Sequence, residues 1–428
     1  MQITGDVAPE RRYWLPMITA ALLPVFYIPL EIGGSGTSLT FVMFGLVALC
    51  FFKYRPAMRT SVTGVDFFLL AFAGWIVLRL TLIALLSNET VDWGFTVRES
   101  LTLVAGFFAY RLARVDQIRR SIVLGLRIAL VLMLTVEAYQ YFTSLEHLRG
   151  LGYTWERGFN YYQVGGYYRP FGITKTPTIF GAQLAMVGVI VIATAKRYTV
   201  LLTAVIAIAL AVTSTRSAWI GFAVAILFIL AMGGKAIRSR LAVAGVLAIP
   251  VAVIAMLLNP AFFTSIWGRL MSITDGSNVS NLGRTTLWEG VVEAVRPENL
   301  VSGFGNANFI TTLNRYIGST SSLGHAHSNY FQILFRYGLI GLILFVAVII
   351  AMCVVLRRND QRKALWVGSV AAVLVFIIDS TFSPTFGSLH MVVTTFMLFG
   401  LGCSAFEMQS KPVAEAAFKK PASAETWA

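Results

Sequence analysis

Apolar runs long enough to cross a bilayer constrain this chain more than any other feature. There are twelve of them, near residues 14–31, 37–53, 64–86, 94–112, 120–144, 177–195, 199–215, 217–233, 241–258, 329–356, 363–383 and 386–406. A hydrocarbon core about 30 Å thick is crossed by roughly 20 residues of helix. Because 57% of the residues are hydrophobic and only 13% are charged, the chain has too little polar surface to cover such runs in water. We therefore expect an all-α protein, a polytopic transmembrane helical bundle of about 12 spans.

The first run follows Arg11 and Arg12, as the apolar core of a signal peptide follows its basic start. The run is longer than such a core, and no small-residue cleavage site follows it. We expect it to be retained as the first helix.

Basic residues gather in alternate short loops between the runs. The chain has 34 Lys and Arg against 20 Asp and Glu, which gives a net charge of +14. Twenty-one of the 34 lie near the two ends of the chain and around residues 53–59, 111–120, 196–197, 235–240 and 357–363. This bias is typical of the cytoplasmic side, so we expect both termini there. Since no soluble basic domain is present, no nucleic-acid partner is expected.

Two segments on the opposite face are long, and they divide the chain into four parts. Residues 1–258 contain the first nine helices and an external loop at 145–176. Residues 259–328 form a large external loop that we expect to be largely helical. Residues 329–410 contain the last three helices, and residues 411–428 are a cytoplasmic tail that we expect to be disordered. The cysteines Cys50, Cys353 and Cys403 all fall inside apolar runs, and we expect no disulfide.

The first external loop is rich in aromatic and basic side chains. Aromatic rings stack on the apolar faces of sugars, and arginines bind phosphates in a fork. An aromatic belt at the membrane surface is the alternative, but a belt does not need four cations beside it. We expect substrate contacts from Arg157, Arg169, Lys175 and Tyr168.

The second external loop contains an amphipathic helix that ends before Pro297. We expect Asn281 to be its N-cap, which puts Arg284 in the first turn. A cation is unfavourable at that place, so its presence suggests an anion bound beside the free backbone N–H groups. The alternative is a solvated arginine at a frayed helix end.

Arg216 lies in a very short external turn between the apolar runs 199–215 and 217–233. An arginine at the membrane surface is either an anchor for a lipid headgroup or a clamp for a lipid-linked phosphate. The residues alone leave both interpretations open.

Two histidines, His325 and His327, come just before the tenth run. Ser328 or Asn329 can cap the helix there, which puts His327 at its positive end and favours a neutral imidazole. A neutral imidazole accepts a proton from a hydroxyl, so we expect His327 to be a general base, with His325 and Tyr330 contacting the substrate. The alternatives are a loop histidine and a metal site. We expect no metal, because the chain has only two other histidines and no external cysteine.

Charged residues inside the apolar runs are costly unless they are paired or face a cavity. Arg79, Arg127 and Glu137 are in this position. Arg79 and Glu137 lie at similar depth, and we expect them to form an ion pair. Asp379, near the outer end of the eleventh run, either joins the external site or caps a turn.

Three short segments each contain an arginine or a histidine together with a characteristic set of neighbouring residues. They are Arg216 with Ser-Ala-Trp-Ile after it, Gly283-Arg284 leading into Leu287-Trp288, and His327-Ser328 followed after nine residues by Gly338-Leu-Ile-Gly341. Together with the hydropathy pattern, they resemble the O-antigen ligase and O-antigen polymerase superfamily of bacterial envelope enzymes, and the ligases most closely. The ligase pattern favours Leu where this chain has Ile220.

The resemblance implies a glycosyltransferase of the bacterial inner membrane that acts on the periplasmic face and needs no metal or other cofactor. Its donor is a glycan linked to undecaprenyl diphosphate. Ligases transfer that glycan to the lipid A–core of lipopolysaccharide, whereas polymerases transfer it to another lipid-linked repeat unit.

The expected site residues give this reaction a mechanism. Arg216 and Arg284 would hold the departing diphosphate, and His327 would take the proton of the acceptor hydroxyl in a single inverting displacement. The non-enzymatic alternative is a transporter of lipid-linked oligosaccharides, which typically has its polar residues near the middle of the membrane.

Overall fold

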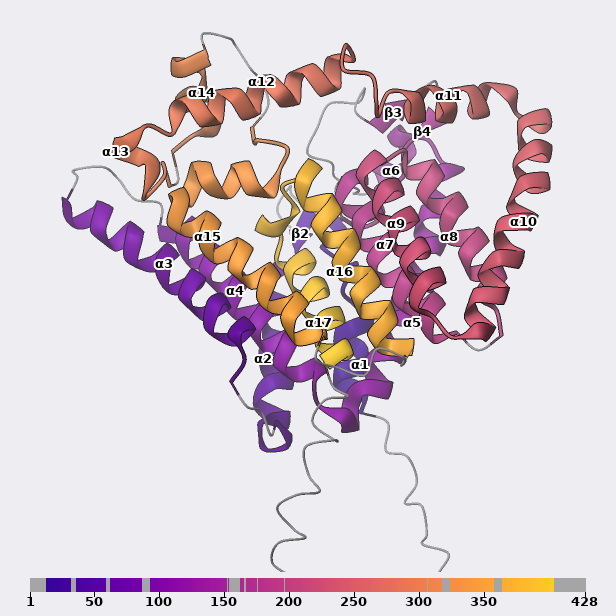
Figure 1. The fold of residues 1–428 in the computed structure, drawn as a ribbon, viewed down its shortest axis with the longest axis horizontal. Helices are drawn as coiled ribbons and strands as arrows, with labels where there is room; N and C mark the ends of the chain where they lie inside the picture. Colours follow the sequence, from indigo (N-terminus) through magenta and orange to yellow (C-terminus); the bar gives the residue numbers. More distant parts are fainter. Residues whose placement is uncertain are drawn as a thin grey trace, which may run out of the picture.

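The computed structural model consists mainly of helices, with two short hairpins (Figure 1). The residues that it describes are 13–31, 36–58, 62–86, 93–151, 153, 162–164, 167–174, 176–195, 197–305, 307–317, 324–357 and 364–403. Their α-helices are α1 (Trp14–Ala21), α2 (Thr40–Tyr54), α3 (Gly64–Leu86), α4 (Trp93–Ala113), α5 (Asp116–Tyr141), α6 (Leu145–Gly150), α7 (Pro177–Thr194), α8 (Thr199–Thr213), α9 (Arg216–Met232), α10 (Lys235–Leu258), α11 (Pro260–Met271), α12 (Val279–Ala294), α13 (Pro297–Leu300), α14 (Phe309–Ile317), α15 (Asn329–Arg357), α16 (Ala364–Phe382) and α17 (Leu389–Cys403). Two 3-10 turns, η1 (Arg55–Ala57) and η3 (Thr385–Gly387), follow α2 and precede α17.

The outer surface of the bundle is apolar. Among the described residues, five helical segments are long and apolar enough to cross a membrane, namely Thr40–Ala57, α5, α7, α15 and α16, and α8, α9 and α17 are apolar but shorter. Large hydrophobic side chains are exposed on the peripheral helices, for example Phe67 on α3 and Leu257 on α10. Exposing such an apolar surface to water is unfavourable, whereas contact with the lipid chains of a membrane is not. The chain is therefore a polytopic helical membrane protein.

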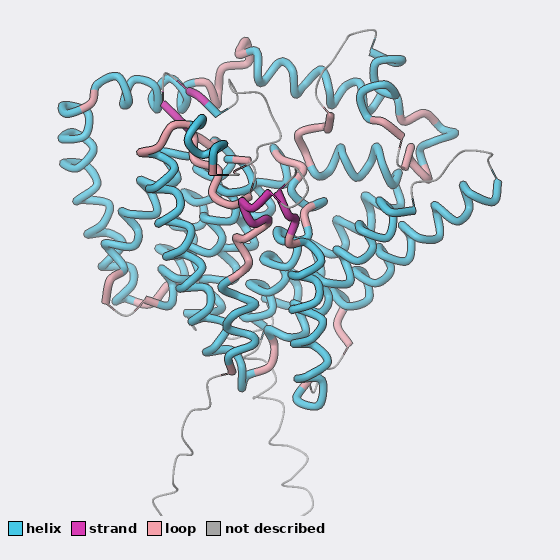
Figure 2. Tube along the Cα trace, turned by 180° about the vertical axis from the view of Figure 1, so that it is seen from behind, coloured by secondary structure: helices cyan, strands magenta, loops and turns pink. Residues whose placement is uncertain are grey.

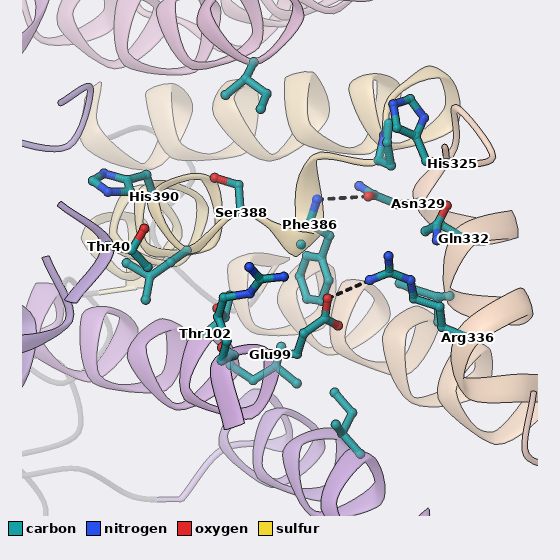
Figure 3. A pocket seen from close by; sticks show the side chains of 18 of the residues that line it. Thr40, Glu99, Thr102, His325, Asn329, Gln332, Arg336, Phe386, Ser388 and His390 are labelled. Carbon is teal, nitrogen blue, oxygen red and sulfur yellow. Dashed lines mark hydrogen bonds and ion pairs between the residues drawn. The ribbon is translucent and has the colours of Figure 1, made fainter. Parts of the chain in front are cut away.

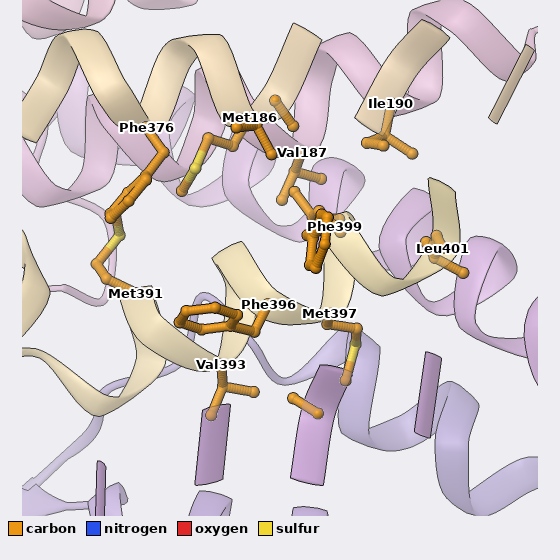
Figure 4. Packing of buried hydrophobic residues seen from close by; sticks show 14 of the residues in the cluster. Met186, Val187, Ile190, Phe376, Met391, Val393, Phe396, Met397, Phe399 and Leu401 are labelled. Carbon is orange, nitrogen blue, oxygen red and sulfur yellow. The ribbon is translucent and has the colours of Figure 1, made fainter. Parts of the chain in front are cut away.

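The centre of the bundle is formed by α7, α16 and α17. Thr176 caps α7 by accepting from the Ile179 N–H at 3.4 Å, and Pro177 occupies the first helical position, where its missing N–H has no cost. Beyond this first turn, the helix is buried on every face. Figure 4 shows its Met186, Val187 and Ile190 among aromatic and methionine side chains of α16 and α17.

Four helices, α11 to α14, form a layer across one end of the bundle (Figure 1). The apolar faces of α12 and α14 make a small separate core from Leu287 and Val291 of α12, Leu313 of α14 and Phe335 of α15. This core joins the layer to the first turns of α15, so the layer has a fixed position over that helix.

The expected first span, residues 14–31, is wrong as a single helix. Helix α1 ends at Ala21, and Tyr27–Glu31 forms strand β1, which pairs antiparallel with β2 (Gly36–Ser38). Pro24 accounts for the break, because it lacks an N–H donor and disfavours helical backbone at the residue before it. A second hairpin joins β3 (Gln163–Val164) to β4 (Tyr167–Tyr168), and Figure 2 shows both hairpins as strands among the helices.

The expected ion pair between Arg79 and Glu137 is also wrong. Arg79 is buried and donates to the carbonyls of Ser302 and Gly303, the latter at 2.8 Å. The Glu137 carboxylate is buried elsewhere and accepts no hydrogen bond from the part of the chain that the structure describes. Similar depth along two helices did not bring the side chains together, because Arg79 is directed at backbone carbonyls of a distant loop.

Candidate functional site

The turn between α8 and α9 carries Arg216 at the first position of α9, before the apolar run 217–233. Ser214, with φ 51°, caps α8 in the left-handed region and reverses the chain within two residues. Arg169 donates to the carbonyls of Thr213 (3.0 Å) and Ser214 (3.4 Å), and Arg269 of α11 donates to Ser214 at 3.3 Å. Two further arginines therefore fix the backbone that carries Arg216.

The Arg216 side chain is directed at the segment between α11 and α12. It donates to the carbonyl (2.7 Å) and hydroxyl (3.1 Å) of Ser272 and to the hydroxyl of Ser280 (3.0 Å). All three acceptors are neutral. Burial, followed by the charges of Arg284 and Arg269, lowers the pKa of Arg216 to about 10, which still leaves it cationic at neutral pH. Three cations thus crowd together, and a bound anion would relieve their repulsion.

Helix α12 carries Arg284, although its start differs from the expected one. Asn278, not Asn281, is the N-cap, and its side chain accepts from the Ser280 N–H at 3.1 Å. The Asn281 side chain instead donates to the carbonyls of Ser272 and Asp275. Arg284 therefore lies in the second turn, and the argument from an unfavourable first-turn cation does not apply. Its link to the site is electrostatic, because its charge acts on Arg216.

The last turn of α16 lies beneath these cations. Asp379 is fully buried and accepts from the hydroxyls of Ser217 and Thr385, both at 2.9 Å. The charge of Arg284 also acts on Asp379. Asp379 therefore ties the start of α9 to the end of α16 and to the turn η3.

The loop that carries His327 is held from three sides. The Trp288 indole N–H of α12 donates to the Ala326 carbonyl at 2.8 Å, and the Ala326 N–H donates to the Gln332 side chain at 2.8 Å. The Ser328 hydroxyl donates to the carbonyl of Ser380 on α16 at 3.4 Å. His327 itself has φ 51°, a left-handed conformation that a non-glycine residue adopts at a cost of about 1–3 kcal/mol when its surroundings hold it there.

The cap expected for α15 is not made by the side chains of Ser328 and Asn329. Ser328 is bonded to Ser380, and Asn329 donates to the Ser380 hydroxyl at 2.9 Å while accepting from the Phe386 N–H at 2.9 Å. Both residues attach the start of α15 to the end of α16 and to η3. The end of α16 therefore bonds to Ser217 and Ser328, the neighbours of Arg216 and His327 in the chain.

A break inside α15 sets the position of its first turns. Gly338 has φ 65° and ψ −166°, which is not helical. The carbonyls that the break releases are satisfied by other segments. Those of Phe335 and Arg336 accept from the N–H groups of Phe304 (2.7 Å) and Gly305 (2.8 Å), and that of Tyr337 accepts from the Trp75 indole (3.0 Å). The segment Gly303–Gly305 is therefore the partner of this break.

A cavity of about 430 Å³ lies beside His325, between α4, the first turns of α15 and the start of α17. Figure 3 shows Glu99 of α4 and Arg336 of α15 meeting on its wall, with an O···N distance of 2.8 Å. His390 and Thr40 lie on the opposite side of the view from His325 (Figure 3). The sequence did not identify this pair, because its members are 237 positions apart.

Of the remaining residues that we expected to contact the substrate, only some lie near Arg216 or His327. Arg169 reaches it through the turn before Arg216, and the rings of His325 and His327 lie 4.3 Å apart. Tyr168 packs against a local cluster around Leu145, and Tyr330 packs edge-on against Phe345. Arg157 and Lys175 lie outside the described residues.

Other residues of the site were missed from sequence. Arg269 and the serines Ser272 and Ser280 were not singled out, although a basic residue on the amphipathic stretch of α11 was a signal for the first. Within the described part of the chain, no group of three or more His, Cys, Asp and Glu side chains is arranged to hold a metal ion.

Fold and site together define a helical membrane protein with a cationic cluster and two histidines under a helical layer. Residues 199–346 match the family described as O-antigen ligase. The match runs from α8 to the middle of α15 and includes Arg216, Arg284 and His327. A comparison with curated proteins found no match. The family is one of membrane enzymes of the O-antigen ligase and polymerase type, which transfer glycans from lipid-linked substrates.

Proposed function

We propose that this protein is an O-antigen ligase, which moves a glycan from undecaprenyl diphosphate to the lipid A–core of lipopolysaccharide. Two features favour ligase over polymerase. One is the description of the matching family, and the other is the spacing of nine residues between His327-Ser328 and the glycines of α15.

The observation that carries the proposal is the 3.0 Å hydrogen bond from Arg216 to the Ser280 hydroxyl, because Ser280 lies one turn before Arg284 on α12 and so brings together two cations from segments far apart in the sequence. The diphosphate gains charge as it leaves the anomeric carbon, and fixed cations stabilise a charge that develops in a transition state. Arg216 and Arg284 would bind the diphosphate, and Arg269 would hold the turn beneath it. The arginines would then supply the positive charge that a divalent ion supplies elsewhere, so the reaction is proposed to be metal-independent.

His327 is proposed as the general base. The oxygen of the acceptor hydroxyl forms a bond to the anomeric carbon while the bond from that carbon to the diphosphate oxygen breaks. The electron pair leaves with the diphosphate, and the hydroxyl proton passes to the imidazole. A single displacement inverts the anomeric configuration.

The proposed topology has about 12 spans in the bacterial inner membrane, with both termini in the cytoplasm and the site in the periplasm. Eleven of the twelve expected runs coincide with a helix, namely α2 to α5, α7 to α10 and α15 to α17. The helical layer of α11 to α14 would then be the large periplasmic loop at 259–328.

The test is the activity of Arg216→Ala, Arg284→Ala and His327→Ala, each purified and assayed with lipid-diphosphate glycan and lipid A–core. Each variant is expected to insert normally and to lose glycan transfer. Near-normal transfer by all three would show that the site is elsewhere. A transporter would make no product in this assay even as the unaltered protein.

Two lipopolysaccharide banding patterns distinguish ligase from polymerase. A deletion strain that loses every capped form supports the ligase, whereas retention of single-repeat caps supports the polymerase. Polymerase activity is the second candidate because the family includes both types and both use the same donor.

A further inference from the structure

The cavity beside His325 is not part of the arginine cluster. Its volume of about 430 Å³ is within the range of small-ligand pockets, roughly 300–1,000 Å³. The lining is mixed, and besides Glu99 and Arg336 it includes Thr102, Gln332, Ser388, Phe72 and Phe386. Hydroxyl and amide groups beside aromatic rings match a ligand that has both hydroxyls and apolar faces.

The ion pair Glu99–Arg336 gives the cavity wall a carboxylate acceptor next to a guanidinium donor. The two side chains are mostly buried, with 11% and 26% of their surfaces exposed. Neighbouring hydroxyls of a sugar can donate to the first and accept from the second, and such hydrogen bonds to charged groups are stronger than neutral ones.

The arginine cluster around Arg216 and the cavity beside His325 differ in charge, and this difference indicates which substrate group binds at each. Around Arg216 the cations crowd together, and its hydrogen-bond acceptors are neutral serine groups, which suits a diphosphate. The cavity wall has Glu99 together with Arg98 and Arg336, so a carboxylate offsets part of the positive charge there and repels a phosphate, which no acceptor around Arg216 does. A neutral, hydroxyl-rich group fits the cavity better.

The histidines connect the two places. His325 lines the cavity, and its ring lies 4.3 Å from that of His327. Arg336 belongs to the same first turns of α15 that follow His327, ahead of the break at Gly338. A sugar in the cavity is therefore close to the proposed base, with His325 between the two.

We propose that this cavity binds the acceptor sugar and that Glu99 and Arg336 hold its hydroxyls so that the attacking hydroxyl faces His327. The inference rests on the proposed function, because it needs a hydroxyl acceptor for the glycan. The acceptor is the sugar part of a glycolipid, either lipid A–core or a second lipid-linked repeat unit.

The test uses the full-length protein in detergent, with each substrate titrated at saturating concentration of the other and with both acceptors in separate arms. Glu99→Gln and Arg336→Gln are expected to raise the KM for the acceptor about 10- to 100-fold, as expected for the loss of one charged hydrogen bond. The KM for the donor is expected to change less than about twofold. The control is Arg119→Gln, which breaks an exposed ion pair with Asp116 and is expected to change neither KM.

Two further variants separate recognition from folding. The swap Glu99→Arg with Arg336→Glu keeps an ion pair, so it is expected to keep thermal stability closer to that of the unaltered protein than either single reversal while the acceptor KM stays raised. Thr102→Phe fills the cavity while leaving both members of the pair in place and is expected to raise the acceptor KM alone.

Recovery of the acceptor KM in the swap would show that the pair is only structural, and an unchanged KM in Thr102→Phe would show that the acceptor binds elsewhere. Equal increases in both KM values would also overturn the inference. In all three cases the unaltered protein still makes product. Failure of the proposed function differs, because the unaltered protein then makes no product with either acceptor.

Discussion

Replacing Gly338 with alanine tests whether the break in α15 holds the site together. With φ 65° and ψ −166°, Gly338 is in a region that only glycine occupies readily. A Cβ at this position would overlap the Val301 carbonyl and lie 2.7 Å from the Gly303 nitrogen. Both obstacles are backbone atoms, so a side-chain rotation cannot relieve the contact.

The expected cost of Gly338→Ala follows from these two terms. An L-residue in such a conformation is strained by about 1–3 kcal/mol. Overpacking against a well-packed backbone adds about 1–3 kcal/mol. A total near 3–4 kcal/mol is a change of more than about 100-fold in the folding equilibrium constant.

The measurements are the thermal unfolding of the purified protein in detergent and the rate of glycan transfer. Gly74→Ala in α3 is the matched control, since a Cβ there meets nothing within 4 Å and alanine is the better helix former. Gly338→Ala is expected to lower the unfolding temperature and the transfer rate, while the control changes neither downward. Unfolding temperatures and rates that are the same for the two variants would refute the account of the break.

Three further predictions concern the site itself. Trp288→Phe keeps the ring stack on Phe331 but removes the hydrogen bond to the Ala326 carbonyl. In steady-state assays kcat is therefore expected to fall about tenfold, with the KM values for donor and acceptor unchanged. A change in the donor KM alone would contradict this prediction. Inorganic pyrophosphate at about 100 times its Kd is expected to stabilise the protein against thermal unfolding by about 2.7 kcal/mol. Arg284→Gln is expected to reduce this stabilisation. An equal stabilisation of the variant would show that Arg284 does not contact the bound anion. Transfer is expected to be unchanged after treatment with EDTA, and activity that is lost and then restored by Mg²⁺ would contradict the role given to the arginines.

Most of the bundle could be predicted from the sequence, because a run of about 20 apolar residues is a local signal. Runs such as 64–86 and 177–195 became α3 and α7 with nearly the expected ends. The cysteines are all free, as expected. The first run is not a single helix, because Pro24 interrupts it although most of the run is apolar.

The arrangement of the site was less accessible from sequence. Arg216, Arg284 and His327 were predicted from their neighbours in the chain, and the end of α16 bonds to the residues that follow Arg216 and His327. The partners of these residues come from segments far apart. Ser272 and Ser280 for Arg216, and Trp288 for the loop of His327, depend on how α11 and α12 pack, and no local pattern encodes that packing.

The N-cap of α12 and the expected Arg79–Glu137 pair also depended on packing that the sequence does not encode locally. Asn278 and Asn281 are three positions apart, both are good caps, and only the path of the preceding turn decides between them. Arg79 was matched with Glu137 by depth alone, whereas its partners are carbonyls of the loop that pairs with the break in α15. Depth along a helix fixes one coordinate of a side chain and leaves its direction open.

The most direct measurement of the central claim is a cryo-EM structure of the full chain with a bound undecaprenyl-diphosphate glycan. We predict phosphate oxygens about 3 Å from the guanidinium groups of Arg216 and Arg284, with the anomeric carbon on the side facing His327. A diphosphate bound away from both arginines, with His327 remote from the anomeric carbon, would contradict the account.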